Sequence, residues 1–213
     1  MGYVCSAEST QNRADLYAGV LRNTPGSATY TRVLHCALAG FDAQHGGQIK
    51  TQWHPWSSSI SVRDDSTGVS ETRQQPMLTG IEFDESGGMI LGLRSRTGDM
   101  ATSLRFPAAY GIPEGDILRA PANGAGGWSA PASAGGEHFS DADFGLLGNG
   151  VPVHRETTWG GTAYVPGQHG GGFGGEVVST GIAPYEPHTG GAYWFNASGG
   201  QWTAREELQN EDL

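Results

Sequence analysis

The sequence predicts an all-β protein built from antiparallel strands that are joined by tight turns. Glycine supplies 35 of the 213 residues, about twice its usual share, and each glycine inside a helix costs about 1 kcal/mol of helix stability. Because glycines interrupt nearly every segment, a helical bundle is excluded. They show no repeat of three residues, so a collagen-like chain is excluded as well. Aromatic residues make up 9% of the chain, which indicates that the strands bury a core.

Strand segments and turn signals alternate from the N-terminus onward. We expect a lone strand at Tyr3–Ala7, followed by an outer hairpin at Asp15–Leu38. The next stretch, Ala39–Gln75, shows no sustained alternation of apolar and polar residues and is expected to be irregular.

The clearest hairpin is Thr79–Arg96, in which apolar strand residues flank a turn at Asp84–Gly88. Asp84 is expected to accept hydrogen bonds from the turn backbone. Gly87 or Gly88 is expected to adopt a positive φ, which glycine does without strain.

The second half of the chain repeats this organisation. An outer hairpin is expected at Gly115–Pro131, an inner pair of strands at Gly160–Ile182 and a last hairpin at Gly191–Leu208. In both outer hairpins an Asn/Gly turn is followed by a tryptophan, Trp128 or Trp202, that opens the return strand. This is a weak internal repeat.

The strand count predicts a propeller-like fold. Four-stranded antiparallel units in series build a β-propeller, and this chain supplies about two and a half of them, whereas a closed ring needs at least four. We therefore expect an incomplete ring in a single domain over residues 1–208, with an acidic tail at 209–213. A second copy could close the ring as a homodimer. A β-sandwich with a similar number of strands is the alternative.

The charge and hydropathy of the chain limit the kinds of partner that it can bind. The chain has 12 basic and 22 acidic residues and a net charge of −10, so it lacks the basic stripe that a nucleic-acid partner requires. No apolar run is long enough to insert into a membrane. No signal peptide precedes the first strand residues, so the chain is expected to be either cytoplasmic or part of something longer. Cys5 and Cys36 could form one bridge or remain two small buried residues.

Acidic residues on strands suggest a calcium site. Glu82 lies between Ile81 and Phe83 and so points to the opposite face of its strand, which in the innermost strand of a propeller lines the central channel. Carboxylates that converge there would bind Ca²⁺, which takes 6–8 oxygen ligands. The alternative is solvated acids on separate surfaces. The candidate ligands are Glu8, Glu82, Glu137 and Glu156, together with Asp141 and Asp143 in the densest acidic loop.

One histidine could take part in catalysis. His154 and Glu156 are two residues apart and therefore share a strand face, where they could act as a base with its orienting acid. Ca²⁺ in a channel would polarise a carbonyl, so a calcium-dependent hydrolase of a small lactone or ester is one functional hypothesis. A packed or hydrogen-bonded histidine is the simpler interpretation. The six tryptophans are expected mainly to fill space beneath strands, although a surface tryptophan could stack on a glycan or another small-molecule ligand.

Seven segments occur in an order that resembles the propeller-like region of large bacterial surface proteins that carry serine–aspartate-repeat (SdrD B-like) modules. This resemblance implies a propeller-like binding or structural module that is secreted or displayed on the cell surface, and that family has no catalytic signature to carry over. The segments are VCSAEST (Val4–Thr10), HPW (His54–Trp56), IEFDESGGMILGLRSR (Ile81–Arg96), GDILRA (Gly115–Ala120), GGEHFSDADFG (Gly135–Gly145), HRETTWGGTAYVPG (His154–Gly167) and GGAYWFNASGG (Gly190–Gly200).

Overall fold

The described part of the chain is all-β and antiparallel, as predicted. The computed structural model describes residues 1–46, 49–63, 70–97, 115–131, 139, 144–146, 152–154, 158–167, 174–182 and 189–210. Over these residues every strand pair is antiparallel, and helical structure is limited to a single 3-10 turn, η1 (Arg13–Asp15), and to residues 96 and 97 after the ninth strand.

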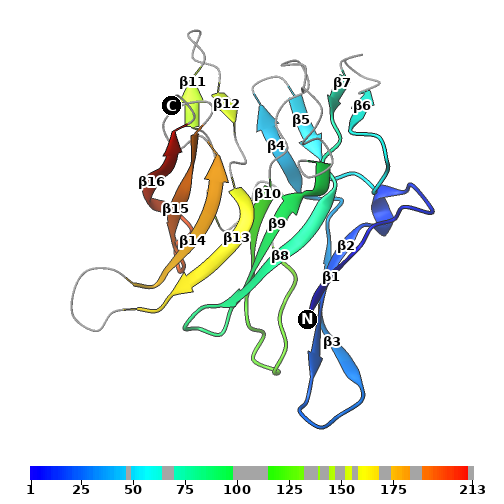
Figure 1. Ribbon diagram of the computed structural model, residues 1–213. Coiled ribbons are helices and arrows are strands. Elements are labelled where there is room, and N and C mark those ends of the chain that lie inside the picture. Colours follow the sequence, from blue (N-terminus) through cyan, green and yellow to red (C-terminus); the bar gives the residue numbers. More distant parts are fainter. Residues whose placement is uncertain are drawn as a thin grey trace.

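Three sheets of three or four strands form the body of the molecule (Figure 1). The first sheet has the order β1 (Gly2–Cys5), β2 (Tyr17–Asn23), β3 (Tyr30–Ala37). The middle sheet has the order β8 (Pro76–Phe83), β9 (Met89–Ser95), β10 (Gly115–Ala120). The third sheet has the order β13 (Thr158–Val165), β14 (Glu176–Ile182), β15 (Thr189–Asn196), β16 (Trp202–Asn210).

Two-stranded ladders add to these sheets, and two of them revise an expectation. The stretch Ala39–Gln75, expected to be irregular, contains four short strands; each has five residues or fewer, too few to show a period in the sequence. The ladders are β4 (Asp42–Gly46) with β5 (Ile49–Gln52), β6 (Ser61–Arg63) with β7 (Ser70–Thr72), and β11 (Phe144–Leu146) with β12 (Pro152–His154).

The expected hairpins form with one exception. The hairpins at Asp15–Leu38, Thr79–Arg96 and Gly191–Leu208 and the inner pair at Gly160–Ile182 are all present. The segment Gly115–Pro131 differs, because β10 pairs with β9 along its whole length and its own return is limited to a single bridge between Ala122 and Trp128. The segment therefore extends the middle sheet by one strand.

The turn of the β8–β9 hairpin has the predicted chemistry. The Asp84 carboxylate accepts hydrogen bonds from the Gly88 amide at 2.8 Å and from the Ser86 hydroxyl at 2.6 Å, and Gly87 has φ +77°. Arg119 of β10 adds an ion pair at 2.6 Å with Asp84, which is itself buried. These hydrogen bonds hold the pKa of Asp84 below its usual value against the opposing effect of burial.

Strands β9 and β10 of the middle sheet are buried on both faces, since the first and third sheets flank the middle sheet (Figure 1). Alternate residues of β9 point to opposite sides. Leu91 and Leu93 join the cluster shared with the first sheet, whereas Ile90 joins the cluster shared with the third. The first cluster also contains Leu16, Ala18, Leu34, Cys36, Leu38 and Trp53, and the second contains Ile117, Phe139, Val177, Tyr193 and Phe195.

Glycines allow the third sheet to approach the middle sheet unusually closely. A Cβ built on Gly92 of β9 would lie 2.1 Å from the carbonyl oxygen of Gly160 in β13, and one built on Gly115 would lie 2.5 Å from that of Thr158. Gly160 has φ +70° within a bulge of β13, and the Thr79 hydroxyl lies 2.9 Å from its carbonyl oxygen. We call this contact, formed by Gly80, Gly92, Gly115 and Gly160, the glycine seam.

The described sheets do not close into a ring. β16 continues to Asn210, beyond residue 208, where the sequence placed the end of the domain. Within the described ranges no helix has the length and apolarity that a membrane span requires.

Candidate binding site

Two of the six predicted calcium ligands lie in the described part of the chain. Glu8 is exposed in the turn after β1, and Glu82 is half-buried on β8. Glu137, Asp141, Asp143 and Glu156 lie outside the described residues. Among the residues that the structure describes, no group of three or more His, Cys, Asp or Glu side chains could hold a metal ion. The calcium centre therefore stays a prediction.

Glu82 has the orientation expected from the alternation of β8. It pairs with Ile90, and two residues earlier Gly80 pairs with Gly92 of the glycine seam. Because residues two apart share a strand face, Glu82 is on the face of β8 that is directed toward β13 rather than on the face of Ile81, which packs against the first sheet.

The candidate base His154 is the last residue of β12 and pairs with Phe144 of β11. Its predicted partner, Glu156, lies outside the described residues. The pairing of His154 with an acid thus stays a prediction.

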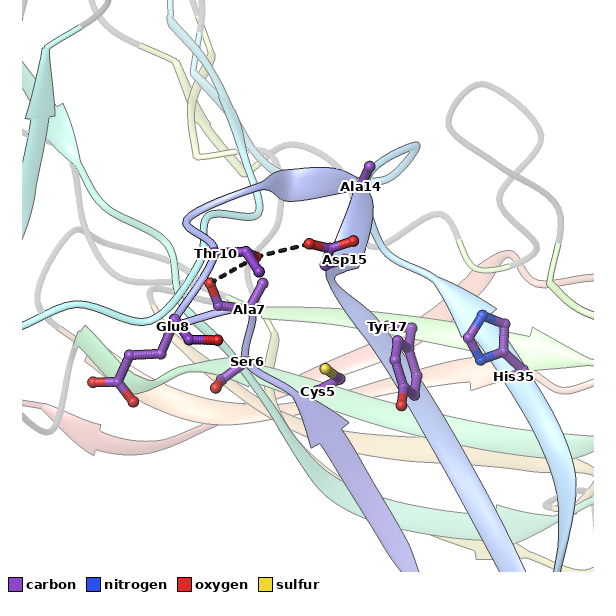
Figure 2. Close-up of a pocket in the computed structure, with 10 residues that line it drawn as sticks. Cys5, Ser6, Ala7, Glu8, Thr10, Ala14, Asp15, Tyr17 and His35 are labelled. Carbon is purple, nitrogen blue, oxygen red and sulfur yellow. Dashed lines mark hydrogen bonds between the residues drawn. The ribbon is translucent and has the colours of Figure 1, made fainter.

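An open pocket of about 880 Å³ lies at the end of the first sheet, where β1 runs into the turn before η1 (Figure 2). Strand side chains line one side of it, and the turn lines the other. The lining residues are Cys5, Ser6, Ala7, Glu8, Ser9, Thr10, Ala14, Asp15, Tyr17 and His35.

The rings of Tyr17 and His35 lie on the strand side of the pocket, and Tyr3 packs next to them outside its lining. The Tyr17 ring centroid is 4.3 Å from that of His35 and 5.9 Å from that of Tyr3, whose ring meets it edge-on. All three residues lie on the same face of the sheet, because Tyr3 and His35 both pair with Gly19, two residues after Tyr17. Ala18 faces the opposite way and is fully buried in the core.

Gly19 makes room for this row of rings. A Cβ at Gly19 would lie 2.5 Å from Cζ of the Tyr3 ring, so Tyr3 can lie across β2 only because this residue has no side chain. The rings therefore reach across all three strands of the sheet.

The turn that lines the other side has a strained but well-anchored backbone. Ala7 and Gln11 have φ +50° and +51°, a conformation that costs a non-glycine residue of order 1 kcal/mol or more. The Gln11 amide donates to the Ala7 carbonyl at 2.8 Å and closes the turn. The Gln11 side chain donates at 2.8 Å to the carbonyl oxygens of Glu8 and Trp56, and the Trp56 amide donates to that of Ser6 at 3.0 Å.

Half-buried polar groups hold the loop behind this turn in place. The Trp56 indole donates to the Pro76 carbonyl at 2.8 Å, and the Arg96 guanidinium lies 4.7 Å from its ring centroid. Arg73 donates to the Pro55 carbonyl at 3.0 Å. Burial, with the nearby charges of Arg73 and Arg13, lowers the pKa of His54 to about 4, so His54 is neutral near pH 7.

One carboxylate of the pocket is held in place. The Thr10 hydroxyl donates to Oδ2 of Asp15 at 2.7 Å (Figure 2). Asn12 caps η1 by accepting from the Ala14 amide at 3.1 Å, which fixes the backbone that leads into Asp15. Glu8 is exposed, and in Figure 2 its carboxylate points away from the rings.

The Tyr17 hydroxyl remains protonated at neutral pH. Desolvation, together with the neighbouring Tyr3 and Cys5 side chains, raises the pKa of Tyr17 above its ordinary value. The phenol therefore offers a neutral donor and acceptor at the mouth of the pocket.

The two cysteines are unbridged. Cys5 is half-buried in the pocket, whereas Cys36 is buried in the core on the opposite face of the sheet. β2 separates the strands that carry them. Burial, with a smaller effect of Asp116, raises the pKa of the Cys36 thiol to about 12.

Glu8 is the one lining residue that the sequence analysis proposed as a site residue, although the segment Val4–Thr10 carried part of the family resemblance. Tyr17 and His35 are 18 positions apart and meet only through the β2–β3 register. No known sequence motif consists of a tyrosine, a histidine and a Thr/Asp pair at these spacings. The positive φ of Ala7 and Gln11 also had no signal, because neither residue favours that conformation.

Searches of family models, curated proteins and solved structures found no significant match to this chain.

Proposed function

We propose that this chain is a propeller-like binding module of a secreted or cell-surface bacterial protein, and that the pocket on the first sheet is its ligand site. The observation that carries the proposal is the construction of the pocket. The rings of Tyr17 and His35, from two neighbouring strands, face an anchored polar turn, and Tyr3 packs edge-on against Tyr17. The site therefore exists before a ligand arrives, and a preformed site loses little entropy on binding.

The stacking of the sheets supports a propeller-like arrangement. Each of the three sheets follows the strand order of the chain, and β9 and β10 of the middle sheet bury both faces against the neighbouring sheets, as adjacent blades do. On this proposal the chain is an incomplete ring that a second copy closes. A molar mass in solution twice that of the chain supports such a dimer, and a monomer contradicts it.

Calcium is proposed as a stabiliser of the module. The support is the net charge of −10 and the acidic residues singled out by the sequence. A higher melting temperature in millimolar Ca²⁺ than in a chelator is the expected result, because a ligand that binds only the folded state stabilises it. An unchanged melting temperature removes calcium from the proposal.

Ligand-observed NMR with a panel of small sugars and polar metabolites tests the ligand site. The decisive variant is Tyr17→Ala, which removes the central ring of the pocket. Tyr30→Ala is the matched control, because Tyr30 lies at the start of β3, is 58% exposed and does not line the pocket. We expect ligands to bind wild type and Tyr30→Ala but not Tyr17→Ala. Equal binding by all three proteins contradicts the proposal.

An assay of lactone and ester hydrolysis separates this function from the hydrolase hypothesis. A binding module shows no turnover above the uncatalysed rate. Turnover that a chelator and the variant His154→Ala both abolish would contradict the binding module and establish the enzyme instead.

A further inference from the structure

From the charge and the rings of the pocket we infer that its ligand carries a cationic ammonium group. This inference rests on the proposed function of the pocket and adds the chemical class of the ligand. It concerns small molecules in which an ammonium group is attached to a compact body, such as an amino sugar or a quaternary alkylammonium.

The charge of the pocket favours a cation. Its ten lining residues include two carboxylates, Glu8 and Asp15, and no lysine or arginine. The whole chain carries a net charge of −10, which repels anions and raises the local concentration of cations. An anionic ligand would therefore meet repulsion both at a distance and in the pocket.

The half-buried Asp15 is the carboxylate best placed to bind an ammonium group. Its Oδ2 already accepts from Thr10 at 2.7 Å, so its orientation is fixed before binding. A carboxylate has about four acceptor positions, and one donated hydrogen bond leaves capacity for an N–H of a primary ammonium. A quaternary ammonium has no N–H and would be attracted by the charge of the carboxylate alone. Asp15 precedes Tyr17 by two residues, and both side chains line the pocket.

The aromatic rings supply the second element of cation recognition. The faces of tyrosine rings attract cations through their quadrupole. Tyr17 is the tyrosine that lines the pocket, and Tyr3 packs edge-on against it at 85°, which fixes the orientation of the Tyr17 ring. An ammonium at Asp15 with its carbon substituents against Tyr17 would use both attractions together.

Two matched pairs of probes test the inference by NMR titration. Choline is compared with its neutral carbon isostere 3,3-dimethylbutan-1-ol, and glucosamine is compared with glucose. In at least one pair we expect the cation to bind several-fold more tightly than its neutral partner, with shifts at Tyr17 and His35. The pair that shows the preference identifies the body of the ligand. Added salt should reduce the preference.

Two charge variants test whether the preference for the cation depends on Asp15. Asp15→Asn preserves an oxygen that can accept from Thr10 and removes only the charge, so it should abolish most of the preference for the cation. Glu85→Gln removes one charge from an exposed residue at the β8–β9 turn, outside the pocket, and should leave the preference intact. Equal binding of both members of each pair, or no shift with either cation at tens of millimolar, overturns the inference. If the neutral probes bind at Tyr17 with the same affinity as the cations, the proposed function still holds. If binding survives in Tyr17→Ala, the proposed function itself is overturned.

Discussion

Adding a single methyl group to the glycine seam tests how the sheets are packed. In Gly92→Ala the new Cβ would lie 2.1 Å from the carbonyl oxygen of Gly160 and 2.9 Å from its carbonyl carbon, whereas ordinary contacts begin at 3.4 Å. Both atoms belong to the backbone, so no side chain can rotate away and β9 and β13 must separate by about 1 Å. We expect a loss of roughly 3 kcal/mol in the free energy of unfolding.

Urea unfolding and thermal melting measure this loss. For a chain of this size, roughly 3 kcal/mol corresponds to a decrease in melting temperature of about 6–12 °C. Gly127→Ala is the control, because its nearest neighbour is the Asn123 side chain at 3.3 Å, which can shift; we expect a loss of less than about 1 kcal/mol there. A stability of Gly92→Ala within about 1 kcal/mol of wild type would refute the close approach of the two sheets.

A double variant at the same seam separates steric overlap from other causes. The Cβ of Gly80→Ala would lie against the Thr162 hydroxyl, which is buried and has no hydrogen-bond partner among the residues that the structure describes. Thr162→Ala therefore costs little alone and should recover part of the stability that Gly80→Ala loses, a coupling of about 1 kcal/mol or more. Additive losses would show that the two residues do not meet.

The remaining predictions follow from buried and half-buried groups. Because the folded-state pKa of His54 is about 4 against 6.5, the unfolded chain binds more protons between these values. The free energy of unfolding should therefore fall by up to about 3 kcal/mol as pH decreases from 6.5 to 4, with a smaller fall in His54→Gln; a flat profile in wild type contradicts this. The pKa of Asp84 is lowered in the folded protein, so protonation of this carboxylate should reduce the free energy of unfolding further only below pH 3.8. Arg119→Met should cost roughly 2–3 kcal/mol, because it leaves the Asp84 carboxylate buried without its cation. Urea unfolding would measure this cost, and an unchanged midpoint would contradict the ion pair. A thiol reagent should label Cys5 in the folded protein and Cys36 only after unfolding, since Cys36 is 1% exposed. Equal labelling rates for the two cysteines in the folded protein would contradict this difference in burial.

Local turn chemistry made much of the fold predictable. Asp84 and Gly87 mark the β8–β9 turn in the sequence, and the structure uses both as expected. An Asn/Gly segment likewise marks the β15–β16 turn, where the Asn196 carboxamide oxygen accepts from the Gly199 amide at 2.7 Å. Short-range hydrogen bonds of this kind depend on a few adjacent residues, so the sequence contains them in full.

Contacts between distant strands were not predictable in the same way. β10 pairs with β9 rather than with its own return segment, since Leu118 and Ala120 complete the core beside the first sheet. The close approach of Gly92 to Gly160 depends on bulges in β8 and β13 that shift both registers. The pocket likewise requires the pairing register of three strands, so Tyr17 and His35 carry no joint signal in the sequence.

Mapping of backbone amide shifts during a titration with glucosamine and choline tests most directly whether the first sheet presents a ligand site. The predicted result is a set of shifts confined to residues 5–17 and to His35, absent in Tyr17→Ala and present in Tyr30→Ala. Shifts located on the middle or third sheet, with the pocket residues unaffected, would contradict it.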